Sequence, residues 1–262
     1  MVSGKLSNDG EKSRDFVGSL VHGLNVIMAF DADSPQMTLS QVAEKTGMNR
    51  AGARRYLLTL AHLGFIQQND RLFSLTPKVM DLGYSFLSTI PISKVSQIYL
   101  DTIRDKSGEA VAIGIMDGAD VIHIAKANSN KLMSPSLTIG RRFPAIYASA
   151  GRVLLAIKSD EARHLLLDQA DFKPLTGKSI TSREVLMKEL DRIRLKDYAF
   201  VDQEIEHGVR SLAVPVFNQS GESVAAISML TNASTVTKKK LINDYLPMLW
   251  DAAQEIKQVL AS

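Results

Sequence analysis

The sequence has no cysteine among its 262 residues. Disulfide bonds, thiolate metal ligands and cysteine nucleophiles are therefore excluded. Long apolar runs are also missing, since nothing approaches the roughly 20 consecutive apolar residues that a membrane-spanning helix needs. The first dozen residues are polar, unlike a signal peptide. We therefore expect a cytoplasmic protein that contacts no membrane.

The common signatures of nucleotide-binding and hydrolytic sites are absent as well. The sequence has no Gly-x-Gly-x-x-Gly, no Gly-x-x-x-x-Gly-Lys and no Gly-x-Ser-x-Gly, and its histidines lack the spacing of a metal-binding pair. The densest polar cluster is Asp202, Glu204, Glu206 and His207; a metal site or acid–base work is one reading, and a solvated loop before a strand is the simpler one. We predict no catalytic residue, no metal and no cofactor.

Positive charge gathers in one stretch, although the formal net charge of the chain is only +3. Between residues 46 and 78 there is one acid, Asp70. The basic residues of that stretch are Arg50, Arg54, Arg55, Arg71 and Lys78. A local basic excess of this kind is the electrostatic footprint of a nucleic-acid-binding module.

Residues 38–75 have the pattern of two helices followed by a hairpin. Thr38 and Gln41 have capping-box spacing, and Gly47 is placed to end the first helix. Asn49 is a favourable N-cap for the second helix. The pattern is typical of a helix-turn-helix.

The second helix and the hairpin have their own apolar patterns. Ala53, Leu57 and Leu60 share one stripe of the helix and are expected to be buried. The apolar residues after Gly64 predict two strands joined by a tight turn at Asn69-Asp70. The hairpin makes the unit a winged helix-turn-helix.

An α-helix fits the major groove of double-stranded DNA, and the planar fork of arginine grips guanine or phosphate. We therefore predict DNA contacts from the second helix, the start of the first helix and the wing. The candidate residues are Thr38, Ser40, Asn49, Arg50, Ala51, Gly52, Arg54, Arg55 and Arg71. The alternative is an ordinary helical hairpin with a solvated basic face.

Composition and periodicity divide the chain into four parts. Residues 1–13 form a flexible polar arm, and residues 14–77 form the DNA-binding domain, which opens with a helix at about 17–30. A linker helix follows at 78–91. Residues 92–262 form a second domain.

The second domain mixes helical and strand patterns. Helices are expected up to Gly108, from Ser149, and at 160–169, 183–195 and 238–260. Strands are expected at AVAIGIM and DVIHIAK, joined at Asp117-Gly118, at 131–137, and at two runs joined at Ser220-Gly221. Antiparallel strands with helices around them predict an α+β fold rather than a parallel nucleotide-binding sheet.

Five stretches spread over nearly the whole chain are distinctive: SLVHGLNVIMAFD, LSQVAEKTGMNRAGARRYLLTLAHLGFI, RLFSLTPKVMDLGYSFL, FPAIYASAGRVLLA and VDQEIEHGVRSLAVPVFNQSGESVAAIS. With these stretches the chain resembles the IclR-type bacterial transcriptional regulators. Within the family, the chain is similar to the subgroup that regulates breakdown of protocatechuate, hydroxybenzoate and related aromatic acids through the β-ketoadipate route.

The resemblance implies a winged helix, a linker helix and a C-terminal effector-binding domain of GAF-like architecture with an antiparallel sheet. It also implies a homodimer or dimer of dimers on a palindromic operator, and a small carboxylate effector, which we expect to be aromatic. Two alternatives stay open. The C-terminal domain only mediates assembly, or the protein is a hydrolase or transferase with an appended basic module.

Several residues are candidates for the effector site. Ser149, Ala150 and Gly151 begin a helix at positions of the family's effector loop, and a helix N-terminus binds anions. A packing turn of small residues is the alternative. Arg141 and Arg142 are candidates for a bidentate clamp on a carboxylate, or are solvated.

The remaining candidates lie on predicted strands. Ser211 stands where many relatives have cysteine, and Ser228 shares a strand face with Leu230. The resemblance implies that small oxo-acid binders have a serine in place of Leu230 and an aspartate in place of Val201. The apolar residues here favour a ligand with an apolar body, against Leu230, Val201 and Met133.

Overall fold

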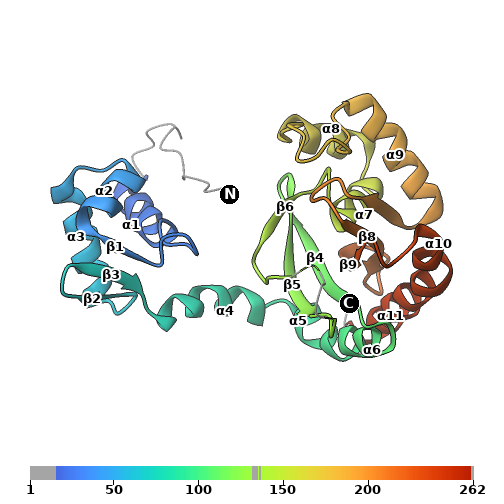
Figure 1. Ribbon diagram of the computed structural model, residues 1–262, viewed down its shortest axis with the longest axis horizontal. Coiled ribbons are helices and arrows are strands. Elements are labelled where there is room, and N and C mark those ends of the chain that lie inside the picture. Colours follow the sequence, from blue (N-terminus) through green and yellow to red (C-terminus); the bar gives the residue numbers. More distant parts are fainter. Residues whose placement is uncertain (1–15, 132–134, 136, 261–262) are drawn as a thin grey trace. The chain divides into compact units, whose positions relative to one another are not determined.

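The computed structural model describes residues 16–131, 135 and 137–260. The chain forms two compact units, and the boundary between them lies between Leu87 and Ser88 (Figure 1). This boundary falls inside the stretch expected to be the linker. In the described residues, no helix combines the length and apolar character that a membrane crossing requires.

Three helices build the N-terminal unit: α1 (Gly18–Met28), α2 (Leu39–Thr46) and α3 (Arg50–His62). The Thr38–Gln41 capping box is formed at the start of α2, and Gly47 ends the helix in the left-handed conformation. Asn49 caps α3 by accepting a 2.7 Å hydrogen bond from the Gly52 N–H. The local signals in the sequence therefore set these boundaries.

A three-stranded antiparallel sheet completes this unit, with the order β1 (Gln36–Thr38), β3 (Leu72–Leu75), β2 (Ile66–Asn69). The predicted turn at Asn69-Asp70 is off by one residue. Asn69 pairs with Leu72, so the turn is Asp70-Arg71, and Asp70 takes a positive φ of 52°. Strand β1 has only three residues and was not predicted.

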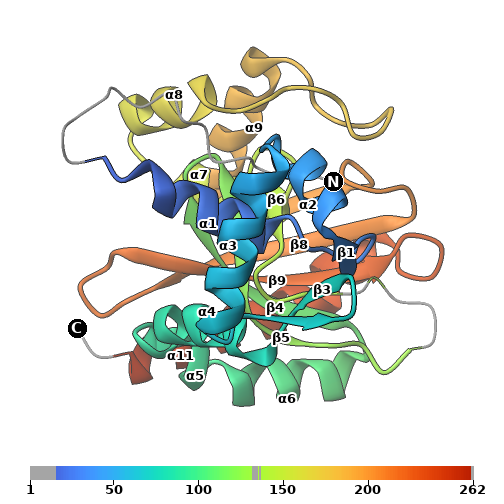
Figure 2. The same ribbon diagram turned by 90° about the vertical axis from the view of Figure 1, so that its left-hand side faces the viewer.

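The core of the N-terminal unit lies between the three helices and the sheet. Each helix contributes fully buried side chains: Val26 of α1, Val42 of α2, and Ala53 and Leu57 of α3. Ala53 and Leu57 belong to the apolar stripe predicted for α3. In Figure 2 the N-terminal unit faces the viewer, and α3 runs across the middle of it. Packing one side of α3 inward leaves its arginine-bearing side outward.

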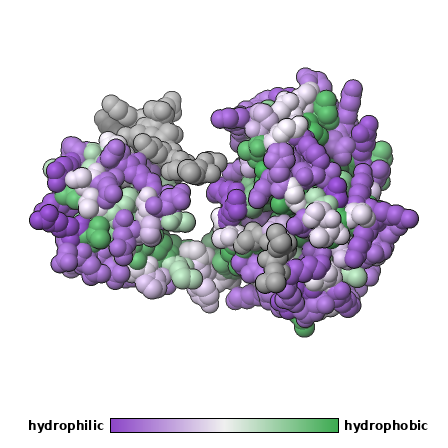
Figure 3. All heavy atoms as spheres, viewed as in Figure 1, coloured by the Kyte–Doolittle hydropathy of each residue, from purple (hydrophilic) through white to green (hydrophobic). Residues whose placement is uncertain are grey.

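A 3₁₀ turn at Pro77–Val79 leads into α4 (Met80–Ser88), which confirms the expected linker helix. Its large apolar side chains are exposed, including Met80, Leu82, Tyr84 and Phe86. The pale and green atoms of the segment joining the two units are visible in Figure 3. Apolar side chains in this number are available to a further protein surface.

The C-terminal unit is built on a six-stranded antiparallel sheet. Its order is β6 (Arg142–Pro144), β5 (Asp120–Ala127), β4 (Ala110–Asp117), β9 (Ser223–Asn232), β8 (Val209–Phe217), β7 (Ala199–Asp202). The α+β fold class is confirmed.

Three details of the predicted sheet are wrong. Asp117 pairs with Asp120, so the turn between β4 and β5 is Gly118-Ala119. The described residues of the strand expected at 131–137 are not in a strand, and the rest of that segment lies outside the described residues; β6 takes the place beside β5. Strands β6 and β7 were not predicted.

Helices cover both faces of this sheet (Figure 1). One face packs against α7 (Ser149–Ala156), which α9 (Arg183–Lys196) covers in turn, with α8 (Asp160–Asp168) alongside. The other face packs against α6 (Gln97–Ser107) and α11 (Leu246–Val259). The remaining turns of helix are α5 (Pro91–Val95), α10 (Lys238–Lys240) and a π-helical turn at Leu241–Tyr245.

The start of α7 is packed against the preceding loop at Gly151. A β-carbon placed on Gly151 would lie 2.7 Å from that of Ala145 and closer still to the Ala145 main chain. A glycine at position 151 therefore allows helix and loop to pack closely. The alternative interpretation of these residues, a packing turn of small residues, predicts this.

We expect Gly151→Ala to lower the free energy of unfolding of the C-terminal unit by about 1–3 kcal/mol, because the methyl group forces helix and loop apart. Urea denaturation followed by the fluorescence of Trp250, the one tryptophan of the chain, measures it. Gly177→Ala is the matched control, since nothing lies within 4 Å of its β-carbon position. Equal stability of the two variants would contradict the assignment.

Candidate DNA-contact surface and effector cavity

The outward side of α3 carries arginines that have no acidic partner. Arg50, Ala51, Arg54 and Arg55 are exposed. In the part of the chain that the structure describes, no carboxylate pairs with any of these three arginines. Charges that folding leaves unpaired are free to meet an external anion, such as a phosphate.

The other predicted DNA contacts lie around this surface in different ways. Thr38 and Asn49 use their side chains as helix caps, and Ser40 is exposed in the first turn of α2. Gly52 is half-buried, with a β-carbon position 3.2 Å from Asn49 Oδ1, so its absent side chain makes room for the cap. Arg71 is exposed at the tip of the hairpin.

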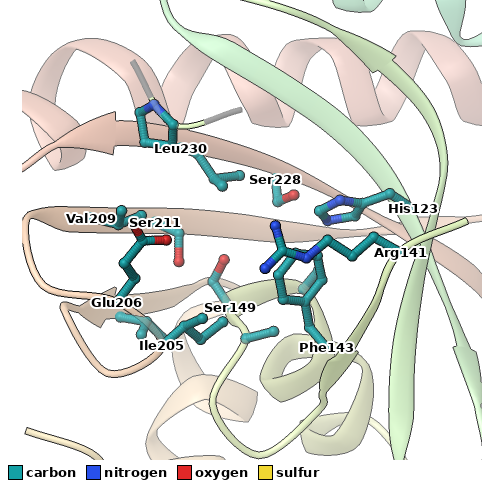
Figure 4. Close-up of a pocket in the computed structure, with 14 residues that line it drawn as sticks. His123, Arg141, Phe143, Ser149, Ile205, Glu206, Val209, Ser211, Ser228 and Leu230 are labelled. Atoms are coloured by element: carbon teal, nitrogen blue, oxygen red, sulfur yellow. The ribbon is translucent and has the colours of Figure 1, made fainter. Parts of the chain in front are cut away.

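The C-terminal unit contains a cavity of about 360 Å³ between the sheet and the start of α7. This volume lies toward the small end of the range of ligand pockets. Its lining residues are His123, Pro135, Arg141, Phe143, Ala148, Ser149, Ala150, Val201, Ile205, Glu206, Val209, Ser211, Ser228 and Leu230 (Figure 4).

Cross-strand pairing explains why several predicted residues meet in this cavity. Val201 of β7 pairs with Ser211 of β8, and Ser211 pairs with Leu230 of β9, so the three form one row across the sheet. Side chains of such a row stand on the same face. Ser228, two residues along β9, stands on that face as well and pairs with Ala213, whose small side chain leaves space beside it.

The start of α7 opens into the cavity. Ala148, Ser149 and Ala150 line it, and no side chain caps the helix. Figure 4 shows the Ser149 hydroxyl pointing into the space. Uncapped N–H groups at a helix N-terminus, together with the positive end of the helix dipole, favour an anion.

Two buried polar groups on the sheet side of the cavity have no hydrogen-bond partner in the described residues: Nδ1 of His123 and Oγ of Ser228. Their residues are only 4% and 1% exposed. Gly114 of β4 pairs with His123 of β5, and a β-carbon on Gly114 would contact the His123 ring. Buried groups without partners cost free energy, which a ligand that bonds to them recovers.

His123 is held in its neutral form. Burial, and then the positive charge of Arg141, lower the pKa of His123 from 6.5 to about 4. Its ring centroid lies 5.2 Å from that of Phe143, and the Arg141 guanidinium lies over the Phe143 ring, 4.8 Å from its centroid. At neutral pH the site therefore presents one cation, Arg141, beside a neutral imidazole.

The two adjacent arginines have different positions. Arg141 lines the cavity, and its guanidinium points toward the middle of it (Figure 4). Arg142 begins β6 and forms ion pairs with Asp117 and Asp120 of the β4–β5 turn, outside the cavity lining. The structure therefore does not bring the two arginines together as a clamp.

A buried ion pair positions both α7 and the loop opposite it. Arg152 of α7 donates to both carboxylate oxygens of Glu204, at 2.7 and 2.5 Å, and to the Ile146 carbonyl oxygen at 2.6 Å. Glu204 also accepts from the Ile180 N–H at 2.9 Å. Ile205 and Glu206, which follow directly, line the cavity.

The predicted effector residues divide into three groups. The cavity lining includes Arg141, Ser149, Ala150, Val201, Ser211, Ser228 and Leu230. Arg142 and Gly151 do not line it, for the reasons given above, and Met133 lies outside the described residues. Seven residues were therefore brought together from separate parts of the sequence.

Sequence reasoning missed several lining residues, among them His123, Phe143, Ile205 and Val209. His123 carried no spacing signal, because it faces the cavity only through the pairing of β5 with β4. Glu206 was noticed only as part of an acidic cluster. In the described residues no group of acids and histidines is arranged to hold a metal.

A winged helix-turn-helix followed by an α+β domain with a ligand-sized cavity defines the class of ligand-responsive DNA-binding regulators. Two family models match the chain: "IclR helix-turn-helix domain" over residues 19–70, and "Bacterial transcriptional regulator IclR C-terminal" over residues 84–258. The chain belongs to the IclR family of bacterial transcriptional regulators.

Individual relatives agree with this assignment. The chain is 37% identical to the Pca regulon regulatory protein of Pseudomonas putida, over 92% of this chain and 84% of that protein. It is 31% identical to the p-hydroxybenzoate hydroxylase transcriptional activator of Acinetobacter baylyi, over 97% and 96%. A solved structure of a transcriptional regulator from Rhodococcus sp. RHA1 is 39% identical, with a TM-score of 0.85 and coverage of 93% and 98%.

The neutral state of His123 makes the stability of the C-terminal unit depend on pH. The unfolded chain binds a proton at His123 near pH 6.5, whereas the folded chain binds it only near pH 4. His123 therefore contributes about 3 kcal/mol to the free energy of unfolding. This contribution is fully present above pH 6.5 and is lost as the pH falls to 4.

We expect urea denaturation followed by Trp250 fluorescence to show a smaller loss of stability between pH 7 and pH 4.5 in His123→Gln than in the parent. The difference between the two pH values is compared, so a constant effect of the substitution on stability cancels. The same pH dependence in both proteins would show that His123 titrates normally.

Proposed function

We propose that this regulator binds a palindromic operator as a homodimer and that a small aromatic carboxylate in the cavity controls it. The DNA half of the proposal rests on one observation, the row of exposed arginines on α3 that lack acidic partners. Because an operator lies in the bacterial cytoplasm, the protein acts there.

Helix α3 and the hairpin have different roles in binding DNA. Helix α3 enters the major groove with Arg50 and Arg54, four residues apart on one side of the helix, directed at base edges. Arg71 at the hairpin tip contacts a phosphate. Base contacts carry sequence information, whereas phosphate contacts carry affinity alone.

A second copy of the chain is the partner that a palindromic operator requires. The exposed apolar side chains of α1 and α4 supply the contact surface. On α1 these are Leu20, Leu24 and Met28, and on α4 they include Met80 and Leu82. Pairing of two such dimers through the C-terminal units gives a tetramer.

We expect Arg50→Ala and Arg54→Ala to weaken binding to the operator by about 1–3 kcal/mol and to relax its sequence preference. Arg71→Ala weakens binding to all sequences alike and lowers the slope of log affinity against log salt by about one. Gel shift and fluorescence anisotropy over a salt series measure both effects.

Arg194→Ala is the matched control for these variants, because Arg194 is an exposed arginine on α9 of the other unit. It should bind the operator as the parent does. Parent-like affinity of Arg50→Ala would instead remove Arg50 from the DNA-contact surface.

The effector half of the proposal rests on the donors that surround the cavity. Burying a carboxylate requires donors, and here the uncapped start of α7, the Arg141 guanidinium, and the unpartnered His123 and Ser228 are available. Val201, Ile205 and Leu230 provide an apolar wall for the body of the ligand. The pca regulon and p-hydroxybenzoate hydroxylase activator relatives support an aromatic acid.

We expect benzoate at 100 times its Kd to stabilise the parent by about 2.7 kcal/mol in thermal unfolding. Arg141→Gln should lower the affinity about tenfold or more, because a charge-assisted hydrogen bond is lost. Arg142→Gln is the matched control, an adjacent arginine outside the cavity lining. If no acid shifts unfolding while the operator is still bound, the C-terminal unit serves assembly alone.

A further inference from the structure

Three acids stand close together before β8, and two of them, Asp202 and Glu204, form ion pairs with cations of the same unit. Asp202 accepts from Arg210 at 2.7 Å and lies 3.6 Å from Lys178. Glu204 is held by Arg152. Within the described residues no cation pairs with Glu206, which is exposed and lines the cavity.

The loop that carries Glu206 is fixed by hydrogen bonds on both sides. The Gln203 N–H donates to the Val209 carbonyl oxygen at 2.8 Å, and the Val209 N–H donates to that of Glu206 at 3.3 Å. Hydroxyls of Thr176 and Ser179 donate, each at 2.7 Å, to the carbonyl oxygens of Gln203 and Glu204. The position of the Glu206 main chain is therefore set by the fold.

The cavity consequently has two ends of opposite character. Figure 4 shows the Glu206 carboxylate beside Ser211 and Val209, while Arg141 and His123 lie on the other side of the space. Arg141 provides the positive charge, and His123 and Ser228 provide unpartnered polar atoms near it. A ligand carboxylate is stabilised at that end, and another anion is destabilised at the end of Glu206.

We propose that Glu206 selects the effector: it accepts a hydrogen bond from a hydroxyl or amino group at the end of a monocarboxylate opposite the carboxylate, and it rejects dicarboxylates. This inference rests on the proposed function, because it takes a carboxylate at the Arg141 end as given. Glu206 is thereby a specificity-determining residue of the cavity.

The physical reason is the acceptor-only chemistry of an ionised carboxylate. A hydroxyl or amino group donates a charge-assisted hydrogen bond to Glu206. A second carboxylate offers no donor and meets Glu206 with like charge. An unsubstituted ring neither donates a hydrogen bond to Glu206 nor repels it, so Glu206 stays hydrated.

A matched set of acids on a benzene ring tests this proposal. Isothermal titration calorimetry at pH 7 measures the affinity of benzoate, 4-hydroxybenzoate, 4-aminobenzoate and terephthalate for the full chain and for Glu206→Gln. In the parent, 4-hydroxybenzoate and 4-aminobenzoate should bind more tightly than benzoate, and terephthalate should bind more weakly than benzoate.

Removing the charge of Glu206 should change these ratios while benzoate changes less than about twofold. Terephthalate should gain about fivefold or more relative to benzoate, and the advantage of the donor-bearing acids should shrink. Glu222→Gln removes another exposed acid, at the β8–β9 turn and outside the cavity, and should leave all four affinities unchanged.

The two ways of failing are distinct. If Glu206→Gln leaves both ratios unchanged while benzoate binds and depends on Arg141, the role of Glu206 is wrong and the proposed function stands. If none of the four acids binds the parent, the proposed effector class is wrong.

Discussion

The buried ion pair between Arg152 and Glu204 holds the effector cavity together. The bidentate contact joins α7 to the loop before β8, and the remaining donors and acceptors of the pair bind Ile146 and Ile180. Breaking a buried pair by removing one partner typically costs about 3–5 kcal/mol, because the other charge stays buried without compensation. The uncapped start of α7 and the loop bearing Ile205 and Glu206 both line the cavity. One interaction therefore links two parts of the cavity lining.

Around this fixed frame the protein leaves polar groups without partners. His123 and Ser228 are almost completely buried, yet neither side chain has a hydrogen-bond partner in the described residues, and no side chain caps α7. Each buried unpaired group costs about 1–3 kcal/mol of stability. Selection for stability alone favours apolar side chains in place of such unpaired polar groups. The buried hydroxyls of Ser96 and Ser223 also lack partners in the described residues, but they do not line the cavity, whereas His123 and Ser228 do. The position of these two groups in the cavity is what supports the proposed ligand contacts.

The sequence was sufficient for the helix boundaries that capping residues set, although both predicted hairpin turns were one residue out of place. The Thr38–Gln41 capping box, Gly47 and Asn49 determine the ends of α2 and α3 through contacts within four residues, so these boundaries were predictable. The three- and four-residue strands β1, β6 and β7 exist because a neighbouring strand pairs with them, and periodicity over so few residues carries little signal. His123 was missed because its position, too, depends on a neighbouring strand. Its place in the cavity depends on the register of β5 against β4, and register cannot be derived from one sequence.

Arginine shows most clearly why residue type alone does not reveal function. Arg152 and Arg163 are fully buried and bond to acids and carbonyl oxygens of their own unit, so their charge is consumed by the fold. Arg142 is exposed but pairs with Asp117. Arg50, Arg54 and Arg141 have no acidic partner in the described residues, and Glu206 in the cavity has no cationic partner there. Because an ion pair within the fold already satisfies its charges, only the unpaired ones have free energy to give to DNA or to an effector. An exposed charge without an ion pair is therefore not enough to mark a functional surface, since Arg194 and Glu222 lie outside both α3 and the cavity. The arginines of α3 share the outward side of one helix, and Arg141 and Glu206 line one cavity.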